Sequence, residues 1–332
     1  MDDGSPAPII ASLFGYLRTA ALQGAIRLDL FTKIAEGTTG AEALAKAAAA
    51  DPRSIRSLCD YLTSIGHLTK SGETYGLTAS SATFLDRRSP AYLGTVEAFL
   101  ASPQNQAQAL TDPLSFIRKD GTVEAGNLAP DNPVWVAYAR AMIPLAGPVA
   151  RATAKVLGPL APDARRILDI AAGSGLFGIE MLRALPKARA VALDWAHVLE
   201  VAAENAGKRG VGDRLELKPG SALELDWGTG YDIVLLPNFV HHFDHAMNVE
   251  LMKRAKQALR PGGRLAVIEF VPNPDRVSIP TIAAFSLMMR VTTPQGDAFT
   301  AAELEAMARD AGYGRVTFTP LGATLQTLMV AE

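Results

Sequence analysis

Between residue 164 and about residue 270, short apolar runs alternate with longer stretches in which apolar residues recur at helical spacing. Strands that alternate with helices predict a mainly parallel sheet covered by helices on both faces. Two further apolar runs near the end of the chain follow each other with only a short turn between them, so the last strand pair should be antiparallel. The expected strands cover residues 165–171, 188–194, 214–220, 231–240, 263–271, 312–321 and 324–332.

The first strand runs into a glycine-rich turn, "ILDIAAGSGLFG", at residues 167–178. Its G-x-G-x-x-G spacing suits a nucleotide-like ligand, because such ligands bind at the carboxyl ends of the strands and glycine permits close backbone approach. Asp194, at the end of the second strand, is placed to accept hydrogen bonds from ribose hydroxyls. Asp169 would repel a pyrophosphate but attract the ammonium and sulfonium groups of S-adenosylmethionine (SAM). The turn therefore favours SAM over a nicotinamide dinucleotide.

The first 90 residues have a different, mainly helical pattern. Two helices that break at Asp51-Pro52 precede a hairpin around Ser71-Gly72, which is a winged-helix order. This stretch carries equal numbers of acidic and basic residues, whereas a DNA-reading domain usually has a basic excess. We therefore expect a packing module. Further along, residues 134–157 predict one long helix with a kink at Pro144.

Composition limits the remaining possibilities. A chain of 332 residues with 48% hydrophobic residues can form two domains, and its net charge of -2 disfavours nucleic acid and membrane partners. Cys59 is the only cysteine, which excludes an intrachain disulfide and a thiolate-cluster metal site. The acidic N-terminus lacks the pattern of a secretory signal, and no apolar run approaches the ~18 residues of a membrane span. We expect a cytoplasmic protein.

Five motifs follow one another in an order typical of one family: "LDIAAGSG", "VALDW", "GSALELDWGTGYDIVLLPNFVHHF", "LRPGGRLAVIEFVP" and "FTAAELEAMARDAGY". Residues 164–332 resemble a class I SAM-dependent methyltransferase. Together with the winged helix, nearly the full chain resembles the small-molecule O-methyltransferases that dimerise through that domain. The resemblance implies a winged-helix-like dimerisation domain at 1–95, a helical connector at 96–160 that contributes to the substrate pocket, and a Rossmann-like SAM domain at 161–332.

The resemblance also implies roles for individual residues. His241 takes the place of the catalytic histidine, a general base, and Glu269 that of the acid beside it. A second flanking acid of the plant enzymes falls on Ala298, and Ala171 stands where many members have glycine. If strand alternation continued to residue 242, His242 would face away from His241. The implied cofactor-binding residues are Asp169, Gly173, Gly175, Asp194, Trp195, Ser221, Ala222 and Asn238.

The expected acceptor pocket is apolar and aromatic, which suits a flat hydroxylated molecule, although these side chains could equally be ordinary core. It comprises Trp135, Met142, His242, Phe285, Met288 and Met289. The spacing of His241 and His245 would suit two metal ligands, but Asp244 as a helix cap with a solvated His245 explains the same residues. We expect no metal.

Several functions remain open from the sequence. The leading expectation is methyl transfer from SAM, with S-adenosylhomocysteine as product, to the oxygen of an aromatic or polyketide-like acceptor by a homodimer. C-methylation on the same scaffold and a SAM-binding protein that no longer transfers methyl are the alternatives. A nicotinamide oxidoreductase is disfavoured by Asp169, and a transcriptional regulator by the neutral winged helix.

Overall fold

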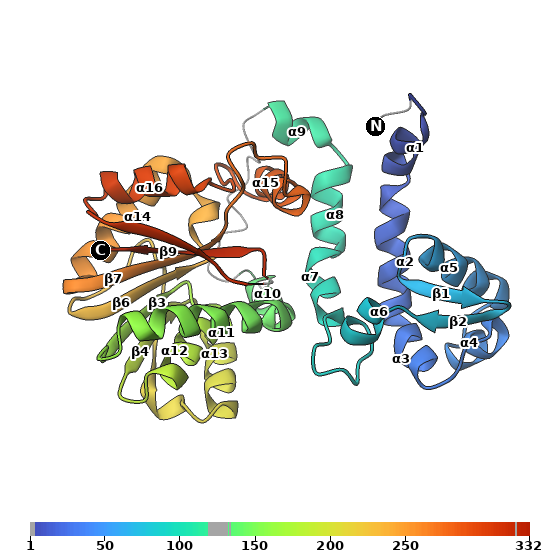
Figure 1. Ribbon diagram of the computed structural model, residues 1–332, viewed down its shortest axis with the longest axis horizontal. Helices are drawn as coiled ribbons and strands as arrows, with labels where there is room; N and C mark the ends of the chain where they lie inside the picture. Colours follow the sequence, from blue (N-terminus) through green and yellow to red (C-terminus); the bar gives the residue numbers. More distant parts are fainter. Residues whose placement is uncertain (1–3, 119–131, 133, 323) are drawn as a thin grey trace. The chain divides into compact units, whose positions relative to one another are not determined.

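The computed structural model describes residues 4–118, 132, 134–322 and 324–332. The chain divides into two compact units, Met1–Ser102 and Pro103–Glu332 (Figure 1). The functional domain boundaries expected at residues 95 and 160 stay predictions.

The first unit has the expected order of two helices and a hairpin. Asp51 begins the second helix of that order, α5, by accepting a hydrogen bond from the Ser54 amide at 2.8 Å. The hairpin strands β1 and β2 pair in an antiparallel register, and one apolar core joins them to α3, α4 and α5. The unit comprises α1 (Ala7–Leu13), α2 (Gly15–Arg27), α3 (Leu30–Ala35), α4 (Ala41–Ala47), α5 (Pro52–Ser64), β1 (Leu68–Ser71), β2 (Thr74–Leu77), α6 (Ala79–Phe84), η1 (Gly94–Val96) and α7 (Glu97–Leu100).

The second unit is built on a seven-stranded sheet with the order β5-β4-β3-β6-β7-β9-β8. The strands from β5 to β7 pair in parallel, and β9 pairs antiparallel with both β7 and β8. The predicted mixed sheet with an antiparallel end is therefore confirmed. Its strands are β3 (Arg166–Ile170), β4 (Arg189–Asp194), β5 (Leu215–Pro219), β6 (Tyr231–Pro237), β7 (Leu259–Phe270), β8 (Val316–Pro320) and β9 (Gln326–Ala331).

Helices cover both faces of this sheet, because successive apolar residues of a strand face opposite sides and both sides must be buried. In β6, Ile233 and Leu235 belong to the apolar core under α11 and α12, whereas Val234 and Leu236 belong to the core under α14 and α16 (Figure 1). The helices of this unit are α8 (Pro103–Leu110), α9 (Pro113–Arg118), α10 (Val134–Ala141), α11 (Ile143–Leu160), α12 (Leu176–Ala184), α13 (Ala196–Lys208), η3 (Gly212–Arg214), η4 (Val240–His242), α14 (His245–Ala258), α15 (Pro280–Thr292) and α16 (Ala301–Asp310).

Two local predictions were wrong. The single kinked helix expected over 134–157 is instead two helices, α10 and α11, which meet at Met142. Pro144 lies in the first turn of α11, where its missing N–H costs no hydrogen bond, so a new helix begins there. The strand expected over 231–240 ends at Pro237, and the chain enters a 3₁₀ turn, η4.

In the part of the chain that the structure describes, no single helix is long and apolar enough to cross a membrane. Among the described helices, only α1 and α2 together have that length and composition, and they are bent by 50° relative to each other.

Candidate active site

The glycine-rich turn joins β3 to α12 at the carboxyl edge of the sheet. Ala171, Gly173 and Gly175 all have left-handed backbones, with φ of 52°, 56° and 74°. Glycine adopts this conformation without cost, whereas Ala171 adopts it at a conformational cost. A Cβ on Gly175 would lie 2.7 Å from the Cβ of Ala202 on α13, whereas one on Gly173 would meet nothing closer than 4.0 Å. Gly175 thus permits helix packing, and Gly173 leaves open space in front of the turn.

Asp169 lies beneath this turn and is fully buried. Its Oδ2 accepts a hydrogen bond from the Gly178 amide in the first turn of α12 at 2.8 Å. Its Oδ1 is buried without a partner among the described residues. Burial raises the pKa of this carboxyl to about 8, and the nearby charge of Asp194 adds to the shift.

Asp194 ends the neighbouring strand β4 and holds the turn from the other side. Its Oδ2 accepts from the Gly173 amide and its Oδ1 from the Trp195 amide, each at 2.7 Å. Burial raises the pKa of Asp194, and these two amide donors oppose that shift. Trp195 begins α13 and packs with Trp135 in one apolar cluster.

The remaining expected cofactor residues lie on loops that follow β5 and β6. Ser221 is buried, and its hydroxyl accepts from the Leu223 amide at 3.2 Å. The carbonyl of Ala222 accepts from the Trp227 indole at 2.9 Å. Asn238 has a left-handed φ of 50° just after β6, and its Oδ1 is buried without a partner in the described structure.

These features fit SAM. Oδ1 of Asn238, and Oδ1 of Asp169 when that carboxyl is ionised, are acceptors without a donor, and the SAM ammonium group is a cationic donor. The space in front of Gly173 lets such a ligand approach the backbone.

His241 and Glu269 form a buried pair at the same edge of the sheet. His241 lies in η4, Glu269 is the last but one residue of β7, and both side chains are nearly enclosed. The Nδ1 atom of His241 lies 2.8 Å from Oε2 of Glu269, and the His241 amide donates to Oε1 at 3.3 Å. Because a carboxylate only accepts, Nδ1 carries the proton and Nε2 is the basic nitrogen.

His242 lies beside His241 rather than facing away from it. The two imidazole centroids are 4.4 Å apart, and the His242 ring also makes an edge contact of 6.1 Å with Trp135. The expectation of opposite faces is wrong because β6 has ended and η4 has no strand alternation. Burial, followed by the charge of His241, lowers the pKa of His242 well below its ordinary value.

Helix α15 supplies the aromatic and methionine side chains expected in the acceptor pocket. Phe285 makes an edge contact of 5.0 Å with the His241 ring and stacks on Phe270 at 4.3 Å. Met289 is buried and Met288 is half-buried on the same helix. Met142 is half-buried where α10 meets α11.

Tyr138 is a site residue that the sequence analysis missed. Its ring makes an edge contact of 6.0 Å with Trp135. Burial raises the pKa of its phenol to about 12, with further contributions from the carboxylates of Glu269 and Asp194. The phenol therefore stays protonated near both carboxylates. Its position three residues after Trp135, on the same face of a helix, is the signal that could have identified it.

A short loop after α15 supports the backbone of His241. The Asp297 amide donates to the His241 carbonyl at 3.0 Å. The Asp297 carboxylate bonds to Ser286 and to Arg290 on α15. Ala298, where a second flanking acid was considered, is buried.

His245 has the surroundings of a surface residue. Asp244 caps α14 through the Met247 amide at 2.8 Å, and His245 is exposed, with Nε2 3.1 Å from Asp310. Among the residues that the structure describes, no group of three or more His, Cys, Asp or Glu side chains is arranged to hold a metal.

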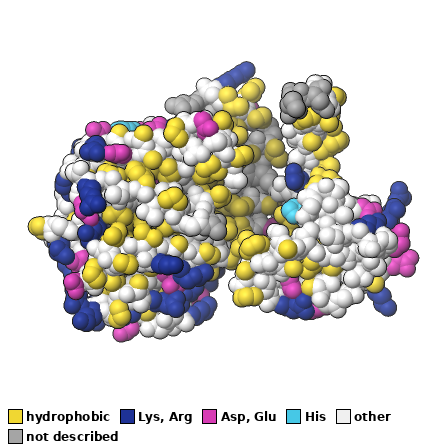
Figure 2. All heavy atoms as spheres, viewed as in Figure 1, with side chains coloured by type: hydrophobic (Ala, Val, Ile, Leu, Met, Phe, Trp, Pro, Cys, Tyr) yellow, Lys and Arg dark blue, Asp and Glu magenta, His cyan; other side chains and the backbone are white. Residues whose placement is uncertain are grey.

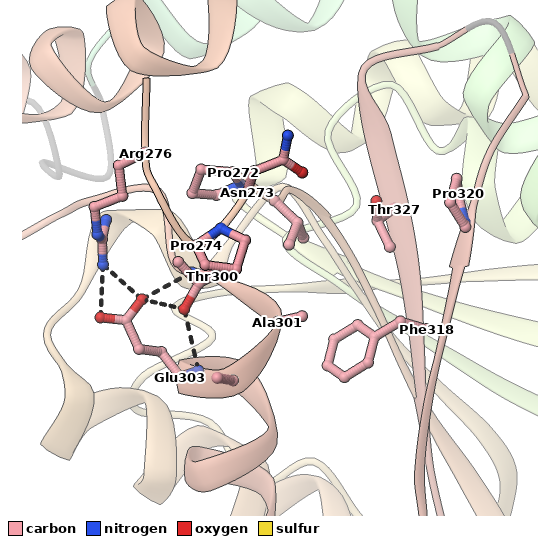
Figure 3. A pocket seen from close by; sticks show the side chains of 12 residues that line it. Pro272, Asn273, Pro274, Arg276, Thr300, Ala301, Glu303, Phe318, Pro320 and Thr327 are labelled. Atoms are coloured by element: carbon pink, nitrogen blue, oxygen red, sulfur yellow. Dashed lines mark hydrogen bonds and ion pairs between the residues drawn. The ribbon is translucent and has the colours of Figure 1, made fainter. Parts of the chain in front are cut away.

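A separate groove lies outside this constellation (Figure 3). It is formed by the segment after β7, the start of α16, the edge strand β8 and its neighbour β9, with Phe318 and Thr327 on its sheet side. Arg276 and Glu303 form an ion pair on the opposite side, and Thr300 caps α16 through Glu303 (Figure 3). No expected site residue lines it.

Comparisons with known proteins agree with this arrangement. The O-methyltransferase domain model matches residues 154–314, and the O-methyltransferase dimerisation domain model matches residues 10–87. The crystal structure of a candidate O-methyltransferase from Nostoc punctiforme is 42% identical, with 98% of this chain and 99% of that chain covered and a TM-score of 0.94.

Two more distant relatives extend the comparison. The tetracenomycin polyketide synthesis 8-O-methyltransferase of Streptomyces glaucescens is 26% identical over 95% of this chain and 93% of its own length. Human N-acetylserotonin methyltransferase in complex with SAM, 18% identical, shares the fold with a TM-score of 0.81 over 98% of this chain and 96% of that chain. The chain belongs to the O-methyltransferase family and is a SAM-dependent methyltransferase with that family's dimerisation domain.

Proposed function

We propose that this enzyme methylates a hydroxyl oxygen on a small aromatic or polyketide-like molecule, with His241 as the general base. The observation that carries the proposal is the buried contact of 2.8 Å between His241 Nδ1 and Glu269. The Streptomyces relative named for polyketide synthesis supports the acceptor class.

SAM supplies an electrophilic methyl group when it is bound. In our proposal Asp169 and Asn238 hold its ammonium group, and Asp194 holds the ribose beside Trp195. Ser221 and Ala222 would line the adenine. Positioning of this kind is the main requirement of a displacement at carbon, and effective molarity alone is worth ~7–11 kcal/mol.

The residues of the chain also move the proton. His241 Nε2 accepts the hydroxyl proton, and Glu269 stabilises the imidazolium that results. The ring of Phe285 packs against the His241 ring and limits the access of water to this pair, which strengthens the ion pair when it forms.

The test compares His241→Ala with His245→Ala, a matched change of an exposed histidine. SAM is supplied with a panel of phenols and hydroxylated anthraquinones, and product is detected by mass. The turnover of His241→Ala should be lower by a factor of ~10²–10⁴ at pH 7, with SAM affinity unchanged. Raising the pH to 9.5 ionises a phenolic acceptor and should therefore partly restore turnover. His245→Ala should match the parent. Equal turnover by His241→Ala and the parent at pH 7 would remove the base assignment.

We also propose that the enzyme is a homodimer joined through its first unit, as the dimerisation-domain match supports. A cytoplasmic location stays a prediction.

A further inference from the structure

Two ring nitrogens beside His241 have no hydrogen-bond partner. Nε1 of Trp135 and Nδ1 of His242 are both shielded from solvent and unpartnered in the described part of the chain. Buried polar atoms of folded proteins almost always have partners, so each such atom requires an explanation. The two rings touch edge to face at 6.1 Å, which places both unpartnered atoms in one neighbourhood.

The chemistry of these rings defines what can satisfy them. An indole N–H is only a donor, so the partner of Trp135 must be an acceptor atom. His242 is neutral at working pH because burial lowers its pKa, and its Nδ1 donates in one of the two neutral tautomers. A single oxygen with two lone pairs can accept from both rings.

We propose that the methyl acceptor carries a carbonyl oxygen, about one aromatic ring from the reacting hydroxyl, that accepts hydrogen bonds from Trp135 and His242. The distance follows from the contacts: the His242 ring lies 4.4 Å from the base His241 and also touches Trp135. This inference rests on the proposed function, because it places the reacting hydroxyl at His241.

A neutral oxygen suits the site better than a carboxylate. Among the described residues, no lysine or arginine makes a cation–π contact with the ring of Trp135 or His242. The buried carboxylate of Glu269, paired with His241, would repel a second anion. Hydroxylated quinones and aryl ketones are therefore the matching class.

The experiment uses two tricyclic probes that differ in their carbonyl groups, 2-hydroxyanthraquinone and 2-hydroxyanthracene. The parent, Trp135→Phe and His242→Phe are compared by kcat/KM with SAM and by calorimetric binding in the presence of S-adenosylhomocysteine. Both substitutions keep an aromatic ring and remove the nitrogen. The difference in acidity between the probes cancels, because each variant is compared with the parent on the same probe.

We expect Trp135→Phe to lower both kcat/KM and affinity for the quinone about tenfold. Its values for the anthracene should change less than twofold, and its SAM affinity should be unchanged. Equal losses on both probes would show a packing role for Trp135 and overturn the proposal, and so would quinone binding that neither variant weakens. If the parent binds the quinone through Trp135 but methylates neither probe, the carbonyl-binding role of Trp135 and His242 is supported and the proposed methyl transfer fails. If the parent binds neither probe, the carbonyl proposal is overturned.

Discussion

Asp169 is a buried carboxyl group at the place where we propose that the SAM ammonium group binds. In the free protein its pKa is raised to about 8 by burial, so at pH 7 most molecules hold the proton. A SAM ammonium group beside Oδ1 would favour the ionised form, so binding should release a proton. We predict that SAM affinity rises between pH 6 and pH 7, by tenfold at most, and that calorimetry in phosphate and Tris buffers detects the release.

Asp169→Asn is the matched control for that prediction, because the amide keeps the shape but cannot ionise. It should bind SAM more weakly and lose most of the proton release, with any remainder coming from Asp194, whose pKa is also raised. Proton uptake, or no proton exchange by the parent, would contradict the expected contact.

The same carboxyl should affect stability, and the sign follows from its raised pKa. Between about pH 4 and about pH 8 the folded protein retains a proton on Asp169 that the unfolded chain releases. The free energy of unfolding should therefore fall as the pH rises through this range. Urea titrations at pH 5 and pH 8 should show a smaller decline for Asp169→Asn than for the parent, and equal declines would refute the raised pKa.

Gly173 and Gly175 allow a matched comparison of two left-handed residues. Alanine at either position has an unfavourable φ, which costs about 1 kcal/mol. Gly175→Ala also drives a Cβ to 2.7 Å from Ala202, so its free energy of unfolding should fall by a further ~1–3 kcal/mol. Gly173→Ala should instead weaken SAM binding, because its Cβ enters the open space. Urea titration and calorimetry separate the two effects, and equal destabilisation by both would contradict this account.

The residues of the site differ in how far the sequence reveals them. Asp194 and Glu269 could be predicted because each lies at or next to the end of a strand, and the ends of parallel strands meet at one edge. Tyr138 could be identified only in part: its spacing places it on the helix face of Trp135, but its approach to Asp194 depends on how α10 packs on α13. Likewise, the direction of the Asp297 carboxylate depends on Ser286 and Arg290 of α15.

At the scale of elements, the loop at Gly296 packs against the backbone of η4 and holds His241 in position. A Cβ on Gly296 would lie 2.3 Å from the His241 carbonyl oxygen and 2.4 Å from the Thr293 hydroxyl. Gly296→Ala must therefore displace the backbone of the base. We predict a fall in kcat of about tenfold or more with SAM affinity within twofold of the parent.

Gly314→Ala is the control for this change, since its Cβ would meet only the Glu332 carbonyl at 3.9 Å. It should leave kcat unchanged. Normal kcat for Gly296→Ala, measured on the same acceptor, would show that η4 tolerates the shift and that the loop does not position His241.

The helices and strands could be predicted where the hydrophobic pattern is regular. The points at which they end could not be predicted from that pattern. Short apolar runs predicted the buried strands, and Asp51-Pro52 predicted the start of α5. The end of β6 at Pro237 and the junction at Met142 were missed, because the apolar run continues through both points. The hydrophobic pattern indicates which residues are buried, and a 3₁₀ turn or a second helix can be as buried as the element before it.

At the scale of the whole molecule, the reversal of the last strand pair follows from chain length. A parallel crossover needs about ten residues or more, and only residues 321–325 separate β8 from β9. The two units also differ in what the sequence reveals. The apolar residues of the second unit's strands are buried in the cores of that unit. In contrast, α1 of the first unit has no buried residue in this structure.

We expect the exposed surface of α1 to form part of the dimer interface. Ile9 and Leu13 of α1 are 66% and 68% exposed, and Phe14, Tyr16 and Leu17 continue the apolar surface onto α2 (Figure 2). Monomeric proteins rarely expose so continuous an apolar surface. If it is buried in a homodimer, two such side chains from each protomer are worth up to ~6–12 kcal/mol, at ~1.5–3 kcal/mol each. Ile9→Gln with Leu13→Gln should therefore weaken the dimer by at least about a hundredfold, which light scattering across a dilution series would measure. Val277→Gln is the matched control, because Val277 is 69% exposed in the other unit, and its mass should match that of the parent. A double variant with the mass of the parent at every concentration would place the dimer interface elsewhere.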